Sequence, residues 1–380
     1  MGKPERSARF LLLHSETGGG HRRAALAVAE ALKDRYGERA QVELVDALAA
    51  YAPWPLRRAP DWYGKALWGG GRTYGLGYRL LDGRRRAQAL SRLFWPRVAP
   101  AARRLLAEHP ADVVATFHPL PVHTISRALS EEGLPIPLVA VGTDLVVMHA
   151  FWADPHVRRY LVATGQTRDQ LVHHGVSPDR VEVTGLPVGR HFREAAREDP
   201  AEVRRGLGLD PEKPLLLLMG GGEGFGPMER VARAVAGARL PAQVTVLTGR
   251  NERLHTRLQR VPWPGPVRVE GFTHEVHRWM RAADLLVTKA GPNTLAEALV
   301  VGVPLVLWGA IPAQETPNVG LVVRAGAGVW APGPRRTVVA AARLLGDVVA
   351  RARMGEQARK LARPEAAERV AQALWEIVRR

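Results

Sequence analysis

Short apolar runs alternate along the chain with stretches in which apolar residues recur at helical spacing. Strands that alternate with helices in this way are typical of parallel α/β sheets. In the first half we predict strands at RFLLLHS, QVELVDA, ADVVATFH, PLVAVGTD, RRYLVAT and RVEVTGLP. In the second half we predict them at PLLLLMGGG, AQVTVLTGR, PVRVEGF, ADLLVTKAG, PLVLWGAIP and GAGVWAP. Helical spacing is clearest at residues 20–35, 228–238, 294–301 and 338–345.

The polar, proline-bounded segment PVGRHFREAAREDP, residues 187–200, separates the two sets of strands. We interpret it as an interdomain linker. The sequence thus predicts an α/β protein with two Rossmann-like domains, residues 1–190 and 191–360, that face each other across a cleft. The remaining residues, 361–380, follow a helix break near Pro364. We expect them to form a helix that crosses back and packs on the N-terminal domain.

The composition is that of a globular protein, because 46% of the 380 residues are hydrophobic and 24% are charged. No apolar run approaches about eighteen residues, so we expect no membrane span. The apolar run near the N-terminus is too short for a signal peptide, and the first predicted strand accounts for it. The chain has no cysteine, which excludes disulfides and thiolate sites and suits a cytosolic protein.

The net charge of +17 is concentrated in one segment. Residues 51–105 contain twelve basic and two acidic residues, a local charge of +10 that leaves +7 for the rest of the chain. The same segment contains four of the ten tryptophans. On the residues alone, three interpretations stay open. The segment lies on an anionic lipid surface, with rings at headgroup depth, or it binds RNA, or its apolar residues belong to the core and its arginines face solvent.

A glycine-rich turn, GGGEGFG at residues 220–226, follows a predicted strand and leads into a helix near Pro227. Glycines let the backbone approach a ligand closely, and the amides of a helix N-terminus attract an anion. The turn therefore indicates a diphosphate site. A dinucleotide site is disfavoured, because the strand QVTVLT ends at residues 249–251 without the carboxylate that would bind an adenosine ribose.

Two more turns follow strands of the second half. In TKAGPNTLAEAL we expect Asn293 or Thr294 to cap a helix, with Glu297 one turn inside it. The carboxylate of Glu297 either binds a ribose diol or complements the helix dipole. In IPAQETPN, the amide of Gln314 and the carboxylate of Glu315 suit the recognition of sugar hydroxyls.

The turn TGGGH places His21 at the start of the first predicted helix. A histidine that titrates near neutral pH can take a proton from an alcohol. A histidine at a helix start also commonly makes a structural hydrogen bond, and the residues alone leave both roles open.

Taken in order, these motifs resemble those of the monogalactosyldiacylglycerol synthases and processive diacylglycerol glycosyltransferases of glycosyltransferase family 28. That family is related to the peptidoglycan glucosaminyltransferase. The resemblance spans nearly the whole chain and is weakest at residues 51–105. It departs at Asn293 and Ala313, where the family usually has glycine, and at Pro317, and these departures leave the donor sugar open. The shared motifs are TGGGHRRAA, VGTDLVVMHAFW, VTGLPV, LLMGGGEGFGPME, LTGRN, GFTHEVHRWMRAADLLVTKAGPNTLAEAL, IPAQETPN and LARPEAAE.

The resemblance implies the GT-B architecture and an inverting, metal-independent transfer of a hexose, galactose or glucose. The donor would be a UDP-sugar and the acceptor the 3-hydroxyl of 1,2-diacylglycerol, with His21 as the catalytic base. The residues implied on the acceptor side are Gly19, Gly20, Asp144, His149 and Trp152. Those implied for the UDP-sugar are Gly221, Gly222, Glu223, Arg250, Phe272, Thr273, Thr288, Lys289, Gly291, Glu297, Gln314 and Glu315.

We expect neither a metal site nor a cofactor. The sequence has no Asp-x-Asp pair, so helix N-termini and backbone amides would meet the charge of the departing UDP. Because diacylglycerol stays in the bilayer, the resemblance favours an anionic membrane, and not nucleic acid, as the partner of residues 51–105. It implies a peripheral protein on the cytoplasmic face of the cell membrane. Three alternatives share the architecture: a UDP-N-acetylglucosamine transferase with another lipid-linked acceptor, a UDP-sugar epimerase and a non-catalytic nucleotide-sugar sensor.

Overall fold

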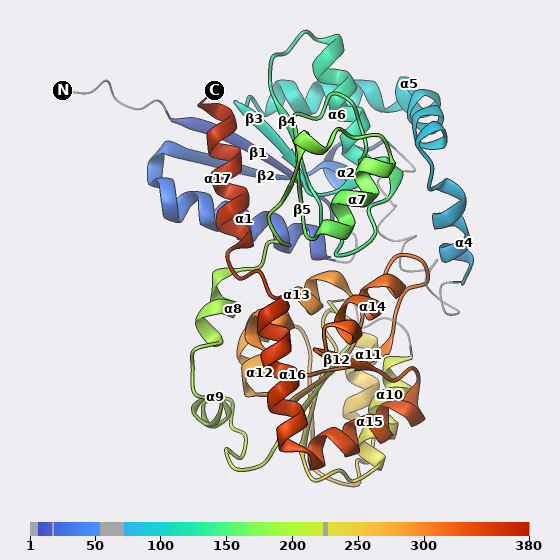
Figure 1. Ribbon diagram of the computed structural model, residues 1–380, viewed down its shortest axis with the longest axis vertical. Coiled ribbons are helices and arrows are strands. Elements are labelled where there is room, and N and C mark those ends of the chain that lie inside the picture. The colour runs from blue at the N-terminus through green and yellow to red at the C-terminus, as the bar shows by residue number, and fades with distance from the viewer. Residues whose placement is uncertain (1–6, 17–18, 54–71, 223–226, 380) are drawn as a thin grey trace, which may run out of the picture. The chain divides into compact units, whose positions relative to one another are not determined.

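The chain forms two compact units in the computed structural model (Figure 1). The structure describes residues 7–16, 19–53, 72–222 and 227–379. The N-terminal unit runs to Gly189 and takes in the chain again from Arg363 onward, whereas Tyr74, Gly75 and residues 190–362 belong to the C-terminal unit. Glu223 and the segment 54–71, with three of the four tryptophans noted above, lie outside the described residues.

The N-terminal unit is built on a six-stranded parallel sheet in the order β2-β1-β3-β4-β5-β6. Its inner strands are apolar and buried because helices cover both faces, whereas the edge strand β2 mixes buried and exposed positions. The strands are β1 (Ala8–His14), β2 (Ala40–Asp46), β3 (Val113–Thr116), β4 (Leu138–Val141), β5 (Arg159–Val162) and β6 (Val181–Val183). The helices are α1 (Gly20–Tyr36), η2 (Gly37–Arg39), α2 (Ala47–Tyr51), α4 (Arg72–Leu81), α5 (Arg84–Glu108), α6 (Pro119–Glu131), η5 (Ala150–Trp152), α7 (Gly165–His173), η6 (Pro178–Arg180) and α17 (Ala366–Val378).

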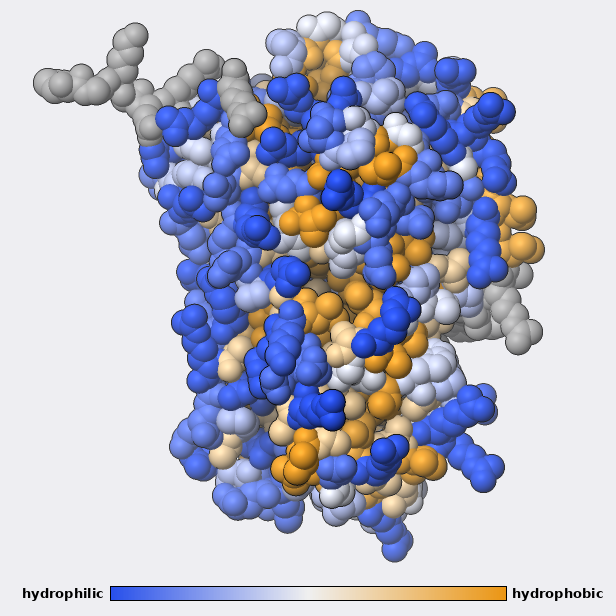
Figure 2. All heavy atoms as spheres, viewed as in Figure 1, coloured by the Kyte–Doolittle hydropathy of each residue, from blue (hydrophilic) through white to orange (hydrophobic). Residues whose placement is uncertain are grey.

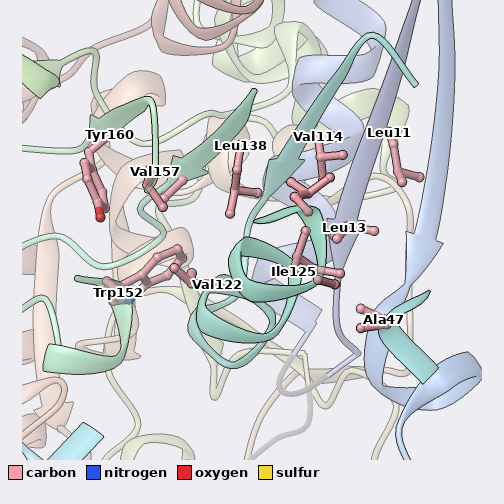
Figure 3. Packing of buried hydrophobic residues seen from close by; sticks show 14 of the residues in the cluster. Leu11, Leu13, Ala47, Val114, Val122, Ile125, Leu138, Trp152, Val157 and Tyr160 are labelled. Carbon is pink, nitrogen blue, oxygen red and sulfur yellow. The ribbon is translucent and has the colours of Figure 1, made fainter. Parts of the chain in front are cut away.

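Successive residues of β1 supply the two cores of this unit, one on each face of the sheet. Leu11 and Leu13 belong to the core beneath α5 and α6, where Ile125 and Trp152 also pack (Figure 3). Phe10 and Leu12 belong to the opposite core, beneath α1 and α17. The apolar run of β1 is thus continuous because both faces are covered.

The C-terminal helix α17 packs on α1 of the N-terminal unit. Trp375 stacks on Tyr36, with ring centroids 4.0 Å apart, and on Phe10 at 5.9 Å. The helix break near Pro364 and the return of the last helix to the N-terminal unit are both confirmed.

The C-terminal unit has a second parallel sheet, in the order β12-β11-β10-β7-β8-β9. Its strands are β7 (Leu215–Met219), β8 (Gln243–Leu247), β9 (Val267–Glu270), β10 (Leu285–Lys289), β11 (Leu305–Gly309) and β12 (Gly328–Trp330). Its helices are α8 (Arg190–Ala195), α9 (Pro200–Gly206), α10 (Met228–Gly237), α11 (Glu252–Gln259), α12 (Val276–Ala282), α13 (Pro292–Val301), α14 (Thr316–Arg324), α15 (Pro334–Gly346) and α16 (Val348–Leu361).

The predicted α/β class and all the predicted strands are confirmed, and helices are found at the four positions of clearest helical spacing. One local prediction is wrong. Helix α13 has Gly291 as its N-cap and Pro292 in its first turn, without a side-chain cap. Proline favours the first helical position because it needs no amide partner there, so Asn293 and Thr294 lie inside the helix instead of capping it.

Candidate active site

The first glycine turn brings His21 to the carboxyl edge of the N-terminal sheet. Gly19 caps α1 with φ 69°, in the left-handed region that glycine adopts without a Cβ penalty. Gly20 is the first residue of the helix, and His21 follows it. Ligands of parallel α/β sheets commonly collect at this edge, so His21 lies where a ligand can bind.

The ring of His21 is held by the ends of two neighbouring strands. Its Nδ1 lies 2.8 Å from the carbonyl oxygen of Phe117 and 2.8 Å from Oγ1 of Thr143. The Thr143 hydroxyl also donates to the Phe117 carbonyl, at 3.4 Å. Because a carbonyl oxygen can only accept, Nδ1 carries the hydrogen and Nε2 keeps its lone pair. The structure therefore makes Nε2 the basic atom of His21.

Burial lowers the pKa of His21 to about 4, against the raising effect of the hydrogen bond to Phe117, and the nearby His14 lowers it further. The expectation that His21 titrates near neutral pH is therefore wrong. At neutral pH the imidazole is uncharged, which is the form that accepts a proton. The low pKa makes it a weaker base that is fully available across the physiological range.

Two more histidines lie around His21. His118 is the N-cap of α6, where its Nδ1 accepts from the backbone amide of Leu120, and its ring meets that of His21 edge-on at 4.5 Å. Burial lowers the pKa of His118 well below its ordinary value, and His21 and His14 add to the effect. Burial also lowers the pKa of His14 at the end of β1. The three imidazoles thus form a neutral, buried cluster.

We expect the N-terminal unit to lose stability as the pH falls below about 6.5, the ordinary histidine pKa. The pKa values of His14, His21 and His118 are lower in the folded chain than in the unfolded chain. The unfolded chain therefore binds more protons at acid pH. The stabilising contribution of the neutral rings is therefore complete above about pH 6.5 and is lost as the pH falls toward 4. Urea unfolding at a series of pH values measures it. His118→Asn, which keeps a capping side chain, should lose less stability on acidification than the native chain, and an equal loss would contradict the prediction.

The other residues implied for the acceptor side lie in loops after β4. Asp144 lies shortly after the last residue of β4, Val141, and is partly exposed. His149 is buried; it donates from Nε2 to the carbonyl of Tyr78, at 3.1 Å, and accepts at Nδ1 from the amide of Phe151. The Trp152 side chain is fully buried in the core. Both have structural roles in these positions, and their contact with an acceptor stays a prediction.

In the C-terminal unit, the described part of the glycine-rich turn packs on the turn that follows β8. The carbonyl of Gly222 accepts from the amide of Arg250, at 2.8 Å. Gly221 and Gly249 have φ of 80° and 62°. A Cβ on Gly249 would lie 2.2 Å from the Gly222 carbonyl oxygen, so glycine is required there. Two strand-end turns are thus joined at the carboxyl edge of this sheet.

Lys289 ends β10, where the register with β11 shifts, and it reaches the same edge. Its Nζ forms a buried ion pair with Oε1 of Glu315, whose Oε2 accepts from the amide of Ile311 at 2.9 Å. A Cβ on Gly221 would lie 3.4 Å from Cε of Lys289, and one on Gly291 would lie 2.9 Å from its Nζ. Lys289, Glu315 and the two glycines are therefore brought together.

Three further residues of the predicted donor set surround this edge. The guanidinium of Arg250 lies over the ring of Phe272, 4.8 Å from its centroid. Phe272 is 50% exposed and presents an aromatic surface beside the β8 turn. The hydroxyl of Thr273 accepts from the amide of Glu275, at 3.0 Å, which shapes the loop after β9.

Thr288, just before the turn that follows β10, and Glu297, after that turn, are both buried. Glu297 is 3% exposed and lies in the second turn of α13. Thr288 is fully buried and donates to the carbonyl of Lys289, at 3.3 Å. Asn318 holds the next helix in place by donating to the carbonyl of Ala290, at 3.0 Å. These contacts order the turn, and the direct roles of Glu297 and Thr288 toward a nucleotide stay predictions.

Gln314 is positioned by a strained turn and by a distant tyrosine. Ala313 has φ 67°, and the amide of Gln314 bonds to the carbonyl of Pro312 at 2.9 Å, as in a γ-turn with positive φ. Tyr74 donates to Oε1 of Gln314, also at 2.9 Å. A Cβ on Gly75 would lie 2.8 Å from Cβ of Pro312. The start of α4, where Tyr74 and Gly75 belong to the C-terminal unit, therefore packs on the Gln314 turn.

Replacing Ala313 by glycine should stabilise the C-terminal unit by about 0.5–1 kcal/mol. A side chain in the left-handed region costs roughly 1–2 kcal/mol, and the greater chain entropy of glycine offsets part of that gain. Thermal or urea unfolding measures the change. Ala310→Gly, at a neighbouring position without positive φ, should be destabilising. Equal effects of the two substitutions would contradict the assignment of strain to Ala313.

Sequence reasoning missed Thr143, His118 and Tyr74. The first two lie at the carboxyl ends of predicted strand segments, so the rule that parallel strands end at one edge could have placed them near His21. Tyr74 lies in the basic segment 51–105, which was interpreted as a whole as a docking element, and no local signal connects it with Gln314. Among the described residues, no group of three or more His, Cys, Asp or Glu side chains is arranged to hold a metal ion.

Two family descriptions match the chain. "Monogalactosyldiacylglycerol (MGDG) synthase" matches residues 21–188 and "Glycosyltransferase family 28 C-terminal domain" matches residues 215–328. Among solved structures, MurG of Acinetobacter baumannii superimposes with a TM-score of 0.63 at 16% identity, over 97% of this chain and 99% of that one. A putative UDP-N-acetylglucosamine 2-epimerase from Listeria monocytogenes gives 0.62 at 15% identity, over 97% and 96%. These two likenesses show the fold, which is GT-B-like.

Curated relatives are much more similar in sequence. The chain is 34% identical to the chloroplastic monogalactosyldiacylglycerol synthase of Spinacia oleracea over 99% of its own length and 74% of the relative. It is 36% identical to a probable monogalactosyldiacylglycerol synthase 2 of Oryza sativa subsp. japonica, over 94% and 78%. His21, Gly221, Lys289 and Glu315 all lie within the matched family regions. The chain therefore belongs to the monogalactosyldiacylglycerol synthase family of glycosyltransferases.

Proposed function

We propose that this chain transfers a galactosyl group from UDP-galactose to the 3-hydroxyl of 1,2-diacylglycerol, with inversion at the anomeric carbon. Family membership supports galactose as the sugar and diacylglycerol as the acceptor. The observation that carries the chemistry is the ring of His21, whose Nδ1 is fixed on Phe117 and Thr143 so that Nε2 keeps its lone pair.

The proposed step needs one proton acceptor and one leaving group. Nε2 of His21 takes the proton of the 3-hydroxyl as its oxygen attacks the anomeric carbon of galactose. The bond from that carbon to the β-phosphate oxygen breaks, and UDP leaves with the electron pair. Turn amides around Gly221 and Gly222 and the start of α10 stabilise the departing diphosphate.

The remaining donor contacts are proposed from the family resemblance and are compatible with the positions of the residues on the C-terminal unit. Arg250 and the exposed Phe272, with Thr273, border the nucleotide base. Glu297 binds the ribose diol, and Gln314 binds galactose hydroxyls. Thr288, Lys289, Gly291 and Glu315 complete the pocket. The Lys289–Glu315 pair gives Glu315 a second role, because it fixes the lysine beside the glycine turn.

A comparison of four donors tests the proposal. Purified protein is incubated with diacylglycerol in mixed vesicles and with labelled UDP-galactose, UDP-glucose or their N-acetyl forms. We expect labelled galactolipid from UDP-galactose at a rate well above those from the other donors. Labelled lipid from an N-acetyl donor alone would favour the N-acetylglucosamine transferase, and a free epimerised nucleotide sugar without lipid product would favour the epimerase.

We further propose that α4 and α5 of the N-terminal unit dock on an anionic membrane. Five large apolar side chains of these helices are exposed by 41–63%: Leu76, Leu80, Leu81, Leu93 and Phe94. They lie among exposed arginines, and Figure 2 shows apolar surface along these helices between hydrophilic side chains. We call these five residues the docking face. No helix in the described ranges is long and apolar enough to span a membrane, so the proposal is peripheral attachment at the cytoplasmic face.

Removing three exposed arginines beside the docking face should weaken binding to anionic vesicles. Each basic residue near an anionic surface contributes about 1 kcal/mol, so the triple variant of Arg79, Arg85 and Arg92 to glutamine should lose about a hundredfold in affinity. Vesicle sedimentation measures it. The control is the triple glutamine variant of Arg335, Arg336 and Arg343, which are exposed on α15. Equal binding of native protein to anionic and neutral vesicles would refute electrostatic docking.

A further inference from the structure

The N-terminal unit contains an apolar cavity of about 410 Å³ between α2, α5 and α6. None of the proposed catalytic or donor-binding residues lines it. Its volume is that of an ordinary ligand pocket, toward the smaller end of the range. The walls are aliphatic and aromatic, with Leu48, Val98, Leu105, Ile125 and Phe151 among the lining residues.

The mouth of the cavity opens at the docking face. Leu81 and Phe94 line the cavity and are also 44% and 41% exposed, and Leu120 of α6 lines it with 42% exposed. Leu80 and Leu93, beside them on the same helices, are exposed by 56% and 63%. The cavity is therefore lined in part by exposed apolar residues of the proposed membrane contact.

The deeper wall is stiffened by a buried polar group. His123 lines the cavity, and its Nδ1 donates to Asp154 at 2.8 Å. Burial disfavours the charged form of Asp154, but the hydrogen bonds from His123, Ser126 and the amide of His156 outweigh it and lower its pKa. The carboxylate thus holds His123 from α6 and keeps its ring fixed in the wall.

We propose that this cavity holds one acyl chain of the diacylglycerol acceptor while the other chain stays in the bilayer. The inference rests on the proposed function, since it takes diacylglycerol as the substrate. The cavity matches an alkyl chain in chemistry, and residues of the proposed docking face line it. A methylene that enters an apolar site from water raises affinity about fourfold. One that enters from a bilayer or a micelle gains less, so we expect a modest dependence of the acceptor's KM on acyl length until the cavity is full.

Filling the cavity tests this directly. Ala101 of α5 lines the cavity and is partly exposed, so Ala101→Phe should obstruct it. We expect the native chain to have a lower KM for dipalmitoylglycerol than for dihexanoylglycerol in the same detergent. Ala101→Phe should lose this preference, with a rise of about tenfold or more in the KM for the long acceptor. The KM for UDP-galactose should stay unchanged. Ala107→Phe, on the exposed side of the same helix, should resemble the native chain.

A second measurement uses the native chain and needs no variant to fold. Diacylglycerol with a diazirine at the end of one acyl chain is photolysed in vesicles with the protein and UDP, and the labelled peptides are identified. Label in α2, α5 or α6 at cavity-lining residues supports the proposal. Galactolipid formation with label confined to other peptides, or an acyl-length preference that Ala101→Phe leaves intact, would overturn it. Absence of galactolipid from the native chain with either acceptor would instead refute the proposed function.

Discussion

Replacing His21 by alanine should reduce turnover by about a hundredfold or more, the usual effect of losing a general base, and leave UDP affinity nearly unchanged. The imidazole lies at the edge of the N-terminal sheet and contacts the ends of β3 and β4, whereas the UDP site is proposed on the C-terminal unit. Single-turnover rates measure the chemical step, and titration calorimetry with UDP measures binding. A variant with near-native turnover would exclude His21 as the base.

A variant of Thr143 separates the loss of the proposed base from the loss of a residue that holds it. Thr143→Val removes the hydroxyl that contacts Nδ1 of His21 but leaves the Phe117 carbonyl, which is sufficient to keep Nδ1 protonated. We expect a much smaller loss of turnover than in His21→Ala.

The acid limb of the pH–rate profile of kcat/KM should lie near pH 4 to 5 in the native chain, because the folded-state pKa of His21 is about 4. A limb near 6.5 with normal folding would contradict the buried, neutral ring.

Replacing Lys289 by methionine should destabilise the C-terminal unit by about 3 kcal/mol. Removing one partner of a buried ion pair leaves the other charge buried without compensation, which typically costs about 3–5 kcal/mol. The side chains of Lys289 and Glu315 are 14% and 4% exposed, so the lower part of that range applies. Urea unfolding of the single variant, followed by a probe in the C-terminal unit, measures the loss.

The double variant Lys289→Met with Glu315→Gln is the control. It removes the second charge and keeps an oxygen that accepts from the amide of Ile311. We therefore expect it to regain much of the stability that the single variant loses. If the double variant is as unstable as the single one, the loss comes from the changed shape of the lysine position and not from an unpaired carboxylate.

The fold was predictable because its inner strands are buried on both faces. Such strands read as apolar runs, and glycine or proline marks the turns that follow them, so the periodicity alone separated strands from helices. The start of α13 was not predicted correctly. From the sequence we expected a polar side chain, Asn293 or Thr294, to cap this helix. Instead Pro292 lies in the first turn and Gly291 is the N-cap.

The site was predictable only in part, for a physical reason. The sequence placed His21 at a helix start, but its pKa is set by burial beside residues about a hundred positions away, Phe117 and His118. We expected Glu315 only to bind sugar hydroxyls. It also forms an ion pair with Lys289, at the end of β10. The contact of Tyr74 with Gln314 joins residues 240 positions apart. Such pairings depend on tertiary packing, which local patterns do not encode.

The most direct test of the account is the structure of the lipid that the chain makes from UDP-galactose and 1,2-diacylglycerol. Proton NMR of the purified product gives the anomeric configuration and the position of the glycosidic bond. We predict a single β-galactosyl group on the 3-hydroxyl, formed by the native chain and reduced in rate by about a hundredfold or more in His21→Ala. An α-linked product, a sugar on another acceptor, or epimerised UDP-sugar without any galactolipid would contradict the account.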